Sequence, residues 1–113
     1  MPIEDLPEKL EDRIVTTDAF TYMRHYELKP ENFDLVPMWA WQYAQGTSST
    51  EGFYEKLYSG MAERMKEKGV VAVTDAIISE TAYDVNSRKA LMYGTAIVPV
   101  KKKEKKDDGV KFP

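Results

Sequence analysis

The sequence contains no cysteine, a single histidine and no long apolar run. Without cysteine, the chain cannot form a disulfide, a thiolate zinc site or an iron–sulfur cluster, and it has no cysteine nucleophile. Without a long apolar run, it offers no candidate for a membrane-spanning helix, and we expect no membrane partner. A chain with no disulfide framework suits a reducing compartment, so the expected location is cytoplasmic.

An excess of positive charge is also absent. The 19 acidic residues outnumber the 16 lysines and arginines, which gives a formal net charge of −3. Binding to nucleic acid depends on surplus positive charge that displaces phosphate counterions, so no nucleic-acid partner is expected. The first twelve residues, MPIEDLPEKLED, are acidic and lack the apolar core of a secretory signal.

The 113 residues predict one domain flanked by two charged ends. Residues 1–12 hold two prolines and five acidic residues and are predicted to form a flexible arm. Residues 101–113, KKKEKKDDGVKFP, are predicted to form a charged flexible tail; a contact with an anionic partner or a neighbouring subunit is the alternative. The domain is then residues 13–100. A chain this short buries only about two-thirds of its unfolded surface, so association with other copies would stabilise it.

The clearest predicted element is a helix over residues 49–68. Ser48 and Glu51 have the spacing of a capping box, and Gly69 suits the left-handed position just past a helix end. Gly60, inside the helix, is expected to permit a close backbone approach. Four apolar residues recur with a spacing of four and form the buried stripe: Phe53, Leu57, Met61 and Met65.

Two strands are predicted after this helix. Residues 70–78, VVAVTDAII, are too continuously apolar for a strand with one face in water. Such a run suits a central strand covered on both faces, or a strand whose second face meets another subunit. The alternation slips around residues 76–78, which predicts a bulge. A turn is expected over residues 84–89, and the last strand over residues 90–100, with Gly94 at a bulge or close contact.

The segment before the long helix is rich in β-branched and aromatic residues, which favours strands. We expect one strand over residues 13–17 and another over residues 20–28. Residues 37–46 are predicted to form a short helix, because Pro37 suits its first turn and Gly46 its end; an aromatic-rich strand is the alternative. The whole predicts an α+β fold in which one long helix packs on an antiparallel sheet, with the core order β-β-α-β-β.

Three short motifs suggest a family. The long helix carries Tyr-Glu at residues 54–55 and leads through a glycine into the alternating strand at residues 69–73. The last strand carries Tyr-Gly-Thr-Ala at residues 93–96, and Val-Thr-Thr stands at residues 15–17. Over residues 52–100 the chain resembles the YbjQ-like family, small proteins catalogued as heavy-metal-binding. The resemblance implies a two-layer subunit of the dodecin or YbjQ kind that assembles into a ring, commonly a pentamer.

A metal cofactor is implied by this resemblance alone. A zinc or copper site needs several imidazole or thiolate ligands, and His25 is the only residue of either kind. Symmetry in a ring could gather one His25 from each subunit; otherwise His25 is an exposed or singly bonded strand residue.

Asp75 lies in an apolar strand and is expected to be partly buried, which would raise its pKa and suit an acid or base. The alternative for Asp75 is a bond from its side chain to a backbone amide at a bulge or to a neighbouring subunit.

The segment Met38–Tyr43, MWAWQY, concentrates aromatic area in a small protein. In a helix Trp39 and Trp41 diverge by about 200°, whereas in a strand they share one face with Tyr43. Three roles stay open for this segment, namely packed core, anchor between subunits, and shelf for a ligand.

These observations predict a non-enzymatic, oligomeric protein, ring-forming and pentameric if it follows the resemblance, with a small ligand or metal between subunits. Two alternatives stay open. One is a small hydrolase that uses Asp75 or His25 in a site shared by subunits. The other is a carrier for a flat aromatic ligand stacked on Trp39, Trp41 or Tyr43.

Overall fold

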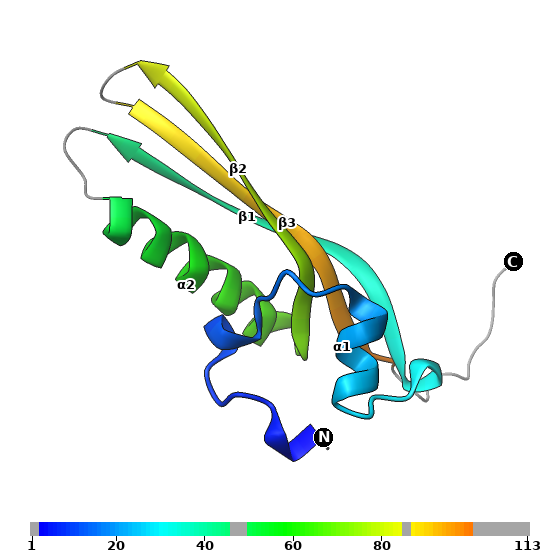
Figure 1. The fold of residues 1–113 in the computed structure, drawn as a ribbon. Helices are drawn as coiled ribbons and strands as arrows, with labels where there is room; N and C mark the ends of the chain where they lie inside the picture. The colour runs from blue at the N-terminus through cyan, green and yellow to red at the C-terminus, as the bar shows by residue number, and fades with distance from the viewer. Residues whose placement is uncertain (1–2, 46–49, 85–86, 101–113) are drawn as a thin grey trace, which may run out of the picture.

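The computed structural model describes residues 3–45, 50–84 and 87–100 of the chain. It has an α+β fold, in which α2 runs along one face of a curved sheet and α1 lies beside the end where β1 begins (Figure 1). The main elements are α1 (Ala19–His25), β1 (Phe33–Gln45), α2 (Thr50–Lys68), β2 (Ala72–Asp84) and β3 (Ser87–Pro99). Short 3-10 helices occupy Ile3–Asp5, Leu10–Arg13 and Pro30–Asn32.

The three strands form an antiparallel sheet in the order β1-β3-β2. β3 therefore lies in the centre, and β1 and β2 are the outer strands. The first predicted strand, residues 13–17, does not form, because Arg13 ends a 3-10 helix and Ile14 makes only an isolated parallel bridge to Val73. A short extended segment lies instead beside β2, where Val15 N donates to Val73 O at 2.9 Å and Ala76 N to Val15 O at 3.0 Å. No described residue pairs with the outer edge of β1.

The second predicted strand, residues 20–28, is wrong, because this segment contains α1. Asp18 caps the helix, because its Oδ2 accepts a hydrogen bond from Thr21 N at 3.1 Å. Hydrogen bonding from the Thr21 side chain, with a smaller effect of the Thr21 backbone, lowers the pKa of the Asp18 carboxyl. Leu28 N closes the other end by donating to Met23 O at 2.8 Å, with Glu27 in the left-handed conformation at φ 58°. Capping at both ends and burial of one side of the helix outweigh the strand preference of its aromatic residues.

The short helix predicted over residues 37–46 is also wrong, and the alternative, an aromatic-rich strand, is what forms. Pro37 lies inside β1, which is compatible with a strand only because β1 is an outer strand whose free side needs no N–H.

The predicted end of the long helix is confirmed. Gly69 has φ 66°, and Val70 N donates to Met65 O at 2.9 Å, as in a Schellman motif. The expected close approach at Gly60 is wrong, because a Cβ built there would meet no heavy atom within 4 Å. The predicted capping box of Ser48 lies outside the described residues.

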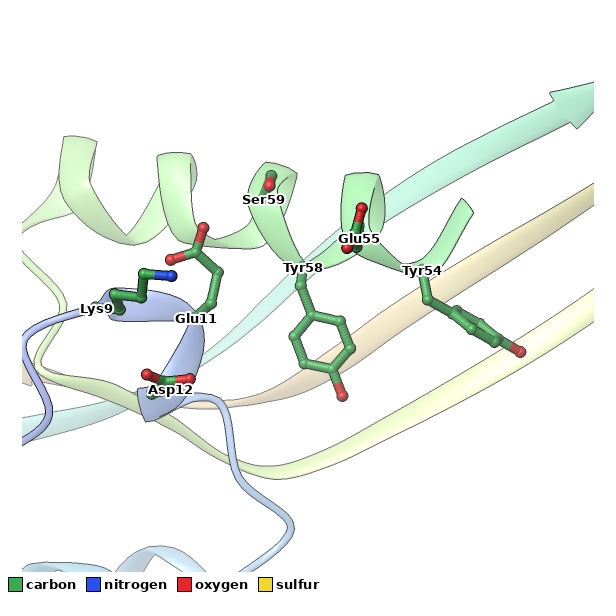
Figure 2. A pocket seen from close by; sticks show the side chains of 7 residues that line it. All are labelled: Lys9, Glu11, Asp12, Tyr54, Glu55, Tyr58 and Ser59. Carbon is green, nitrogen blue, oxygen red and sulfur yellow. The ribbon is translucent and has the colours of Figure 1, made fainter. Parts of the chain in front are cut away.

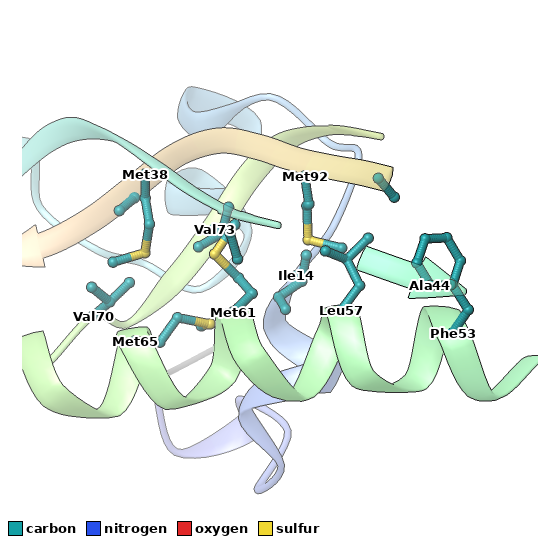
Figure 3. Close-up of a cluster of buried hydrophobic side chains, with 13 residues drawn as sticks. Ile14, Met38, Ala44, Phe53, Leu57, Met61, Met65, Val70, Val73 and Met92 are labelled. Atoms are coloured by element: carbon teal, nitrogen blue, oxygen red, sulfur yellow. The ribbon is translucent and has the colours of Figure 1, made fainter. Parts of the chain in front are cut away.

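The main core lies between α2 and the sheet. The stripe of apolar residues on α2 is fully buried against side chains from β1 and β3, with Met92 and Met38 pointing down onto the helix (Figure 3). The largest fully buried side chains of this core are Leu57, Met61, Met65, Val73 and Met92.

A bulge in β2 shapes the sheet. The register shifts between Thr74 and Ile77, and Asp75 takes φ 55°. The bulge lies opposite Gly94, where an added Cβ would lie 2.6 Å from Thr74 O and 2.8 Å from Val73 Cγ1. The predicted close contact at Gly94 is therefore confirmed, and the bulge begins slightly before the predicted position.

The second face of the sheet is covered at one end only. There α1 contributes Tyr22 and Met23 to a smaller cluster that contains Ala72 and Ile97 of the sheet. Farther along the same face Ile77 is 52% exposed, so the expectation that the apolar strand is covered on both faces holds only for its first half. This uncovered half carries the candidate site.

Candidate functional site

Alternate residues of β1 point to opposite faces of the sheet and meet different surroundings. Met38, Ala40 and Ala44 are buried beneath α2. Trp39 and Trp41, between them, are 51% and 59% exposed on the other face, because successive side chains of a strand alternate. The predicted aromatic segment thus forms a row of rings that no described element covers.

The neighbouring strands extend this row. Tyr93 of β3 pairs with Trp39, and Ile77 of β2 pairs with Tyr93, so the three side chains cross the sheet in line. We call the whole surface the aromatic face. Its residues are Leu35, Trp39, Trp41, Tyr43, Ile77, Leu91 and Tyr93.

Sequence reasoning found the three aromatic residues of β1 and missed the members from β2 and β3. The signal was present in Lys89, Leu91 and Tyr93, which alternate with Ala90 and Met92. Because no strand order was predicted, the central position of β3 and the pairing of these residues with the tryptophans were not foreseen.

The exposed area of the aromatic face is large for a chain of this size. Since a whole aromatic side chain covers about 150–250 Å², the side chains of this face expose roughly 600 Å² together. A contiguous apolar patch of that size in a small protein usually marks a surface that binds something.

One cation borders the face. Lys89 pairs with Tyr43 across the β1–β3 ladder, and its Nζ lies 5.2 Å from the centroid of the Trp41 ring. A cation over an indole is stabilised by about 0.5–1 kcal/mol at an exposed site. This contact holds a positive charge at the edge of the aromatic surface.

A polar network lies on the opposite face of the sheet, toward α2, near the turn between β2 and β3. The Tyr54 hydroxyl of α2 donates to the Glu80 carboxylate of β2, and this hydrogen bond raises the pKa of Tyr54. Arg88 Nη1 lies 3.6 Å from Glu80 Oε1, and its guanidinium lies over the Phe53 ring at 4.7 Å. The network ties both strands of the hairpin to α2.

A broad hollow of about 660 Å³ lies between α2 and the 3-10 helix Leu10–Arg13. Figure 2 shows Glu11 reaching toward Ser59 on α2, while Tyr58 points away from the helix axis. The hollow is lined by Lys9, Glu11, Asp12, Tyr54, Glu55, Tyr58 and Ser59. Its lining has more carboxylates than cations, a composition that repels anions.

The other predicted site residues lie apart from the aromatic row. His25 is exposed at the C-terminal end of α1, not in a strand, and its ring meets Tyr26 edge-on with centroids 4.7 Å apart. Asp75 is exposed, so its expected burial is wrong. It lies at the bulge, where its backbone N donates to Thr17 O at 2.8 Å. The expected bond from its carboxylate to a backbone amide or to a neighbouring subunit stays a prediction. Within the described part of the chain, no three His, Asp or Glu side chains gather closely enough to hold a metal ion.

Comparison with family models, with curated proteins and with solved structures gives no significant match for this chain. Among the helices of the described segments, none has the length and apolar character needed to cross a bilayer. The class that the fold defines is an α+β protein with a three-stranded antiparallel sheet, of which one face is covered at one end only.

Proposed function

We propose that this protein is a non-enzymatic, homo-oligomeric binding protein of the cytoplasm, and that its copies meet through the aromatic face. The observation that carries the proposal is the exposure of Trp39, Trp41 and Tyr93 on one rigid, uncovered surface. Aromatic residues are enriched where protein surfaces meet, and they supply most of the binding energy there.

The area supports association between copies. Two aromatic faces contribute roughly 1,200 Å² together, which reaches the lower end of the range for stable protein interfaces, about 1,200–2,000 Å². The face also suits contact with a second copy of itself. If two copies are related by a twofold axis, both contacting surfaces are apolar. Two sheets packed in this way would lie about 10 Å apart with their side chains interleaved.

The free edge of β1 is a less suitable contact. Pro37 lies in this edge strand and has no N–H to donate to a neighbouring strand. A proline on an outer strand is a common means of preventing edge-to-edge pairing. Association through the face, with the edge left open, agrees with the position of Pro37.

A face-to-face contact is isologous and gives pairs of copies. A ring, including the pentamer implied by the YbjQ-like resemblance, needs a heterologous contact between two different surfaces. We therefore propose the pair as the basic unit, and a ring of copies would require a second contact in addition.

Size-exclusion chromatography with light scattering tests this proposal. We expect the protein to be larger than the 13.0 kDa monomer at micromolar concentration and the double variant Trp39→Ser/Trp41→Ser to be monomeric. The matched control is Phe20→Ser, which changes a 63% exposed aromatic residue of α1 outside the aromatic face. A monomeric parent protein at 100 μM, or equal dissociation by the control, would contradict the proposal.

A second candidate function is the binding of a flat aromatic ligand on the same face. The contact between Lys89 and Trp41 favours it, because a cation beside an indole suits a stacked ring with a negative substituent. Flavin mononucleotide is a suitable probe, with ribose 5-phosphate as the control for binding of the phosphate alone.

Quenching of tryptophan fluorescence by flavin mononucleotide, absent in Trp41→Ser, would support the carrier function. Native mass spectrometry of protein purified from cells would show a retained ligand. Absence of both signals, together with association of the parent protein, would leave the contact between copies as the role of this face.

A further inference from the structure

A small cavity of about 250 Å³ opens beside β1, near the C-terminal end of α2. Its lining combines apolar side chains from the sheet and the start of the loop after α2 with two cations from the last turns of the helix. The residues that matter are Val36, Met38, Val70 and Val98, with Arg64 and Lys68.

The floor of this cavity is the end of the main core. Met38 and Val70 are each 4% exposed, and they point toward one another at the C-terminal end of α2 (Figure 3). Val36, by contrast, is 40% exposed, so the apolar lining continues from the buried floor of the cavity to the protein surface. A ligand placed here would contact apolar atoms on its inner side.

The mouth of the cavity is positively charged. Arg64 and Lys68 are four residues apart on α2, and residues at that spacing lie on the same side of a helix. Both side chains are exposed, and neither forms an ion pair with another residue that the structure describes. Two like charges at this spacing repel each other, and an anion between them would relieve the repulsion.

We infer that this cavity binds a small organic anion, namely a monocarboxylate with a short apolar chain. Ligand sites are mostly apolar with a few convergent polar groups, and pockets for drug-sized ligands measure about 300–1,000 Å³. A cavity of about 250 Å³ therefore fits a smaller molecule, with its chain against Met38 and Val98 and its carboxylate between the two cations.

Pro37 and Trp39 complete the lining, so the cavity shares Trp39 with the aromatic face. The inference is tested on the other six residues, none of which belongs to that face, so it can fail separately from the proposed function. A simpler role for the cations is to offset the negative end of the helix dipole. Lys66, in the same last turn, shares that role and does not line the cavity, so it supplies the control.

The test is a titration of the ¹⁵N-labelled full chain with hexanoate and, separately, with hexylamine, followed by amide chemical shifts. The two probes share one apolar chain and carry opposite charges. We expect hexanoate to shift the amides of Val36, Met38, Val70 and Val98 in a saturable way, and hexylamine to leave them in place. Absence of shifts with hexanoate, or equal shifts with both probes, overturns the inference.

Substitutions then test the role of the cations. Arg64→Gln and Lys68→Gln should each weaken hexanoate binding about two- to fivefold, as expected for loss of an exposed charge contact. Lys66→Gln should leave the affinity unchanged. A loss of the same size in Lys66→Gln would show a non-specific charge effect and would also overturn the inference. The three variants change exposed side chains, so thermal melting should confirm that all of them fold.

Discussion

Trp39 and Tyr93 lie directly opposite each other across the β1–β3 ladder, and their side chains are 51% and 42% exposed. Such cross-strand aromatic pairs contribute about 0.2–1 kcal/mol to a sheet. That contribution is small compared with the free energy that burying the exposed apolar area would supply. The aromatic face is thus costly for an isolated subunit, which is the physical reason for the proposed contact between copies.

If the aromatic face serves association, its residues should matter little to the stability of the isolated subunit. Trp41 is 59% exposed and Leu57 is 1% exposed. Trp41→Ala should lower the free energy of unfolding of the monomer by less than about 1 kcal/mol, whereas Leu57→Ala should lower it by about 2–5 kcal/mol because it leaves a cavity. Urea denaturation at low protein concentration measures both values. Equal losses in the two variants would show that Trp41 belongs to the monomer core.

A Cβ at Gly94 has no room. It would lie 2.6 Å from the carbonyl oxygen of Thr74, a backbone atom that cannot move without changing the bulge. Gly94→Ala should therefore lower the free energy of unfolding by about 1–3 kcal/mol. Gly60→Ala is the matched control, because a Cβ there meets nothing within 4 Å and alanine is the better helix former by about 1 kcal/mol. Thermal melting should show opposite shifts for the two variants, and shifts of the same sign would contradict this account.

The stability of the protein should fall at high pH through Tyr22. Its hydroxyl is buried without a hydrogen bond to any described residue, and burial, with a smaller effect of Tyr26, raises its pKa to about 12. The neutral phenol is favoured in the folded state, so this contribution is complete below the unfolded pKa near 10 and is lost as the pH rises from about 10 to 12.

Tyr22→Phe removes this titration and the unpaired hydroxyl while it keeps the ring. We expect the variant to be as stable as the parent protein at pH 8, or more stable by about 1 kcal/mol, since an unsatisfied buried group is lost. Between pH 9 and pH 11 the parent protein should lose more stability than the variant in urea denaturation. Parallel pH profiles would assign the alkaline sensitivity to other tyrosines.

The sequence predicted elements well where local signals agreed with packing. In α2 the apolar spacing, the terminal Gly69 and the contact of Val70 with Met65 all support one helix, and it forms with nearly the predicted bounds. The close contact at Gly94 was also predicted, because glycine inside a strand usually marks one.

Prediction failed where tertiary contacts outweighed local preference. Residues 20–28 are rich in aromatic side chains, yet Tyr22 and Met23 are buried together by a helix that packs on Ile97, a residue distant in sequence. Pro37 suggested a helix start, and only the position of β1 at the edge of the sheet makes it acceptable in a strand. The order of the strands in the sheet has no local signal in the sequence. Both the aromatic face and the tolerance of Pro37 in β1 depend on that order.

The short extended segment beside β2 has a consequence for the order in which the chain can fold. Val15 N donates to Val73 O, and α1 packs on Ile97, so the first third of the chain docks on a surface built by residues near its other end. The β2–β3 hairpin is local, whereas β1 joins it by pairing Phe33 with Pro99. Because contacts distant in sequence form slowly, we expect the hairpin and α2 to fold first. During synthesis the N-terminal third therefore cannot form its contacts with β2 and β3 until β3 has left the ribosome.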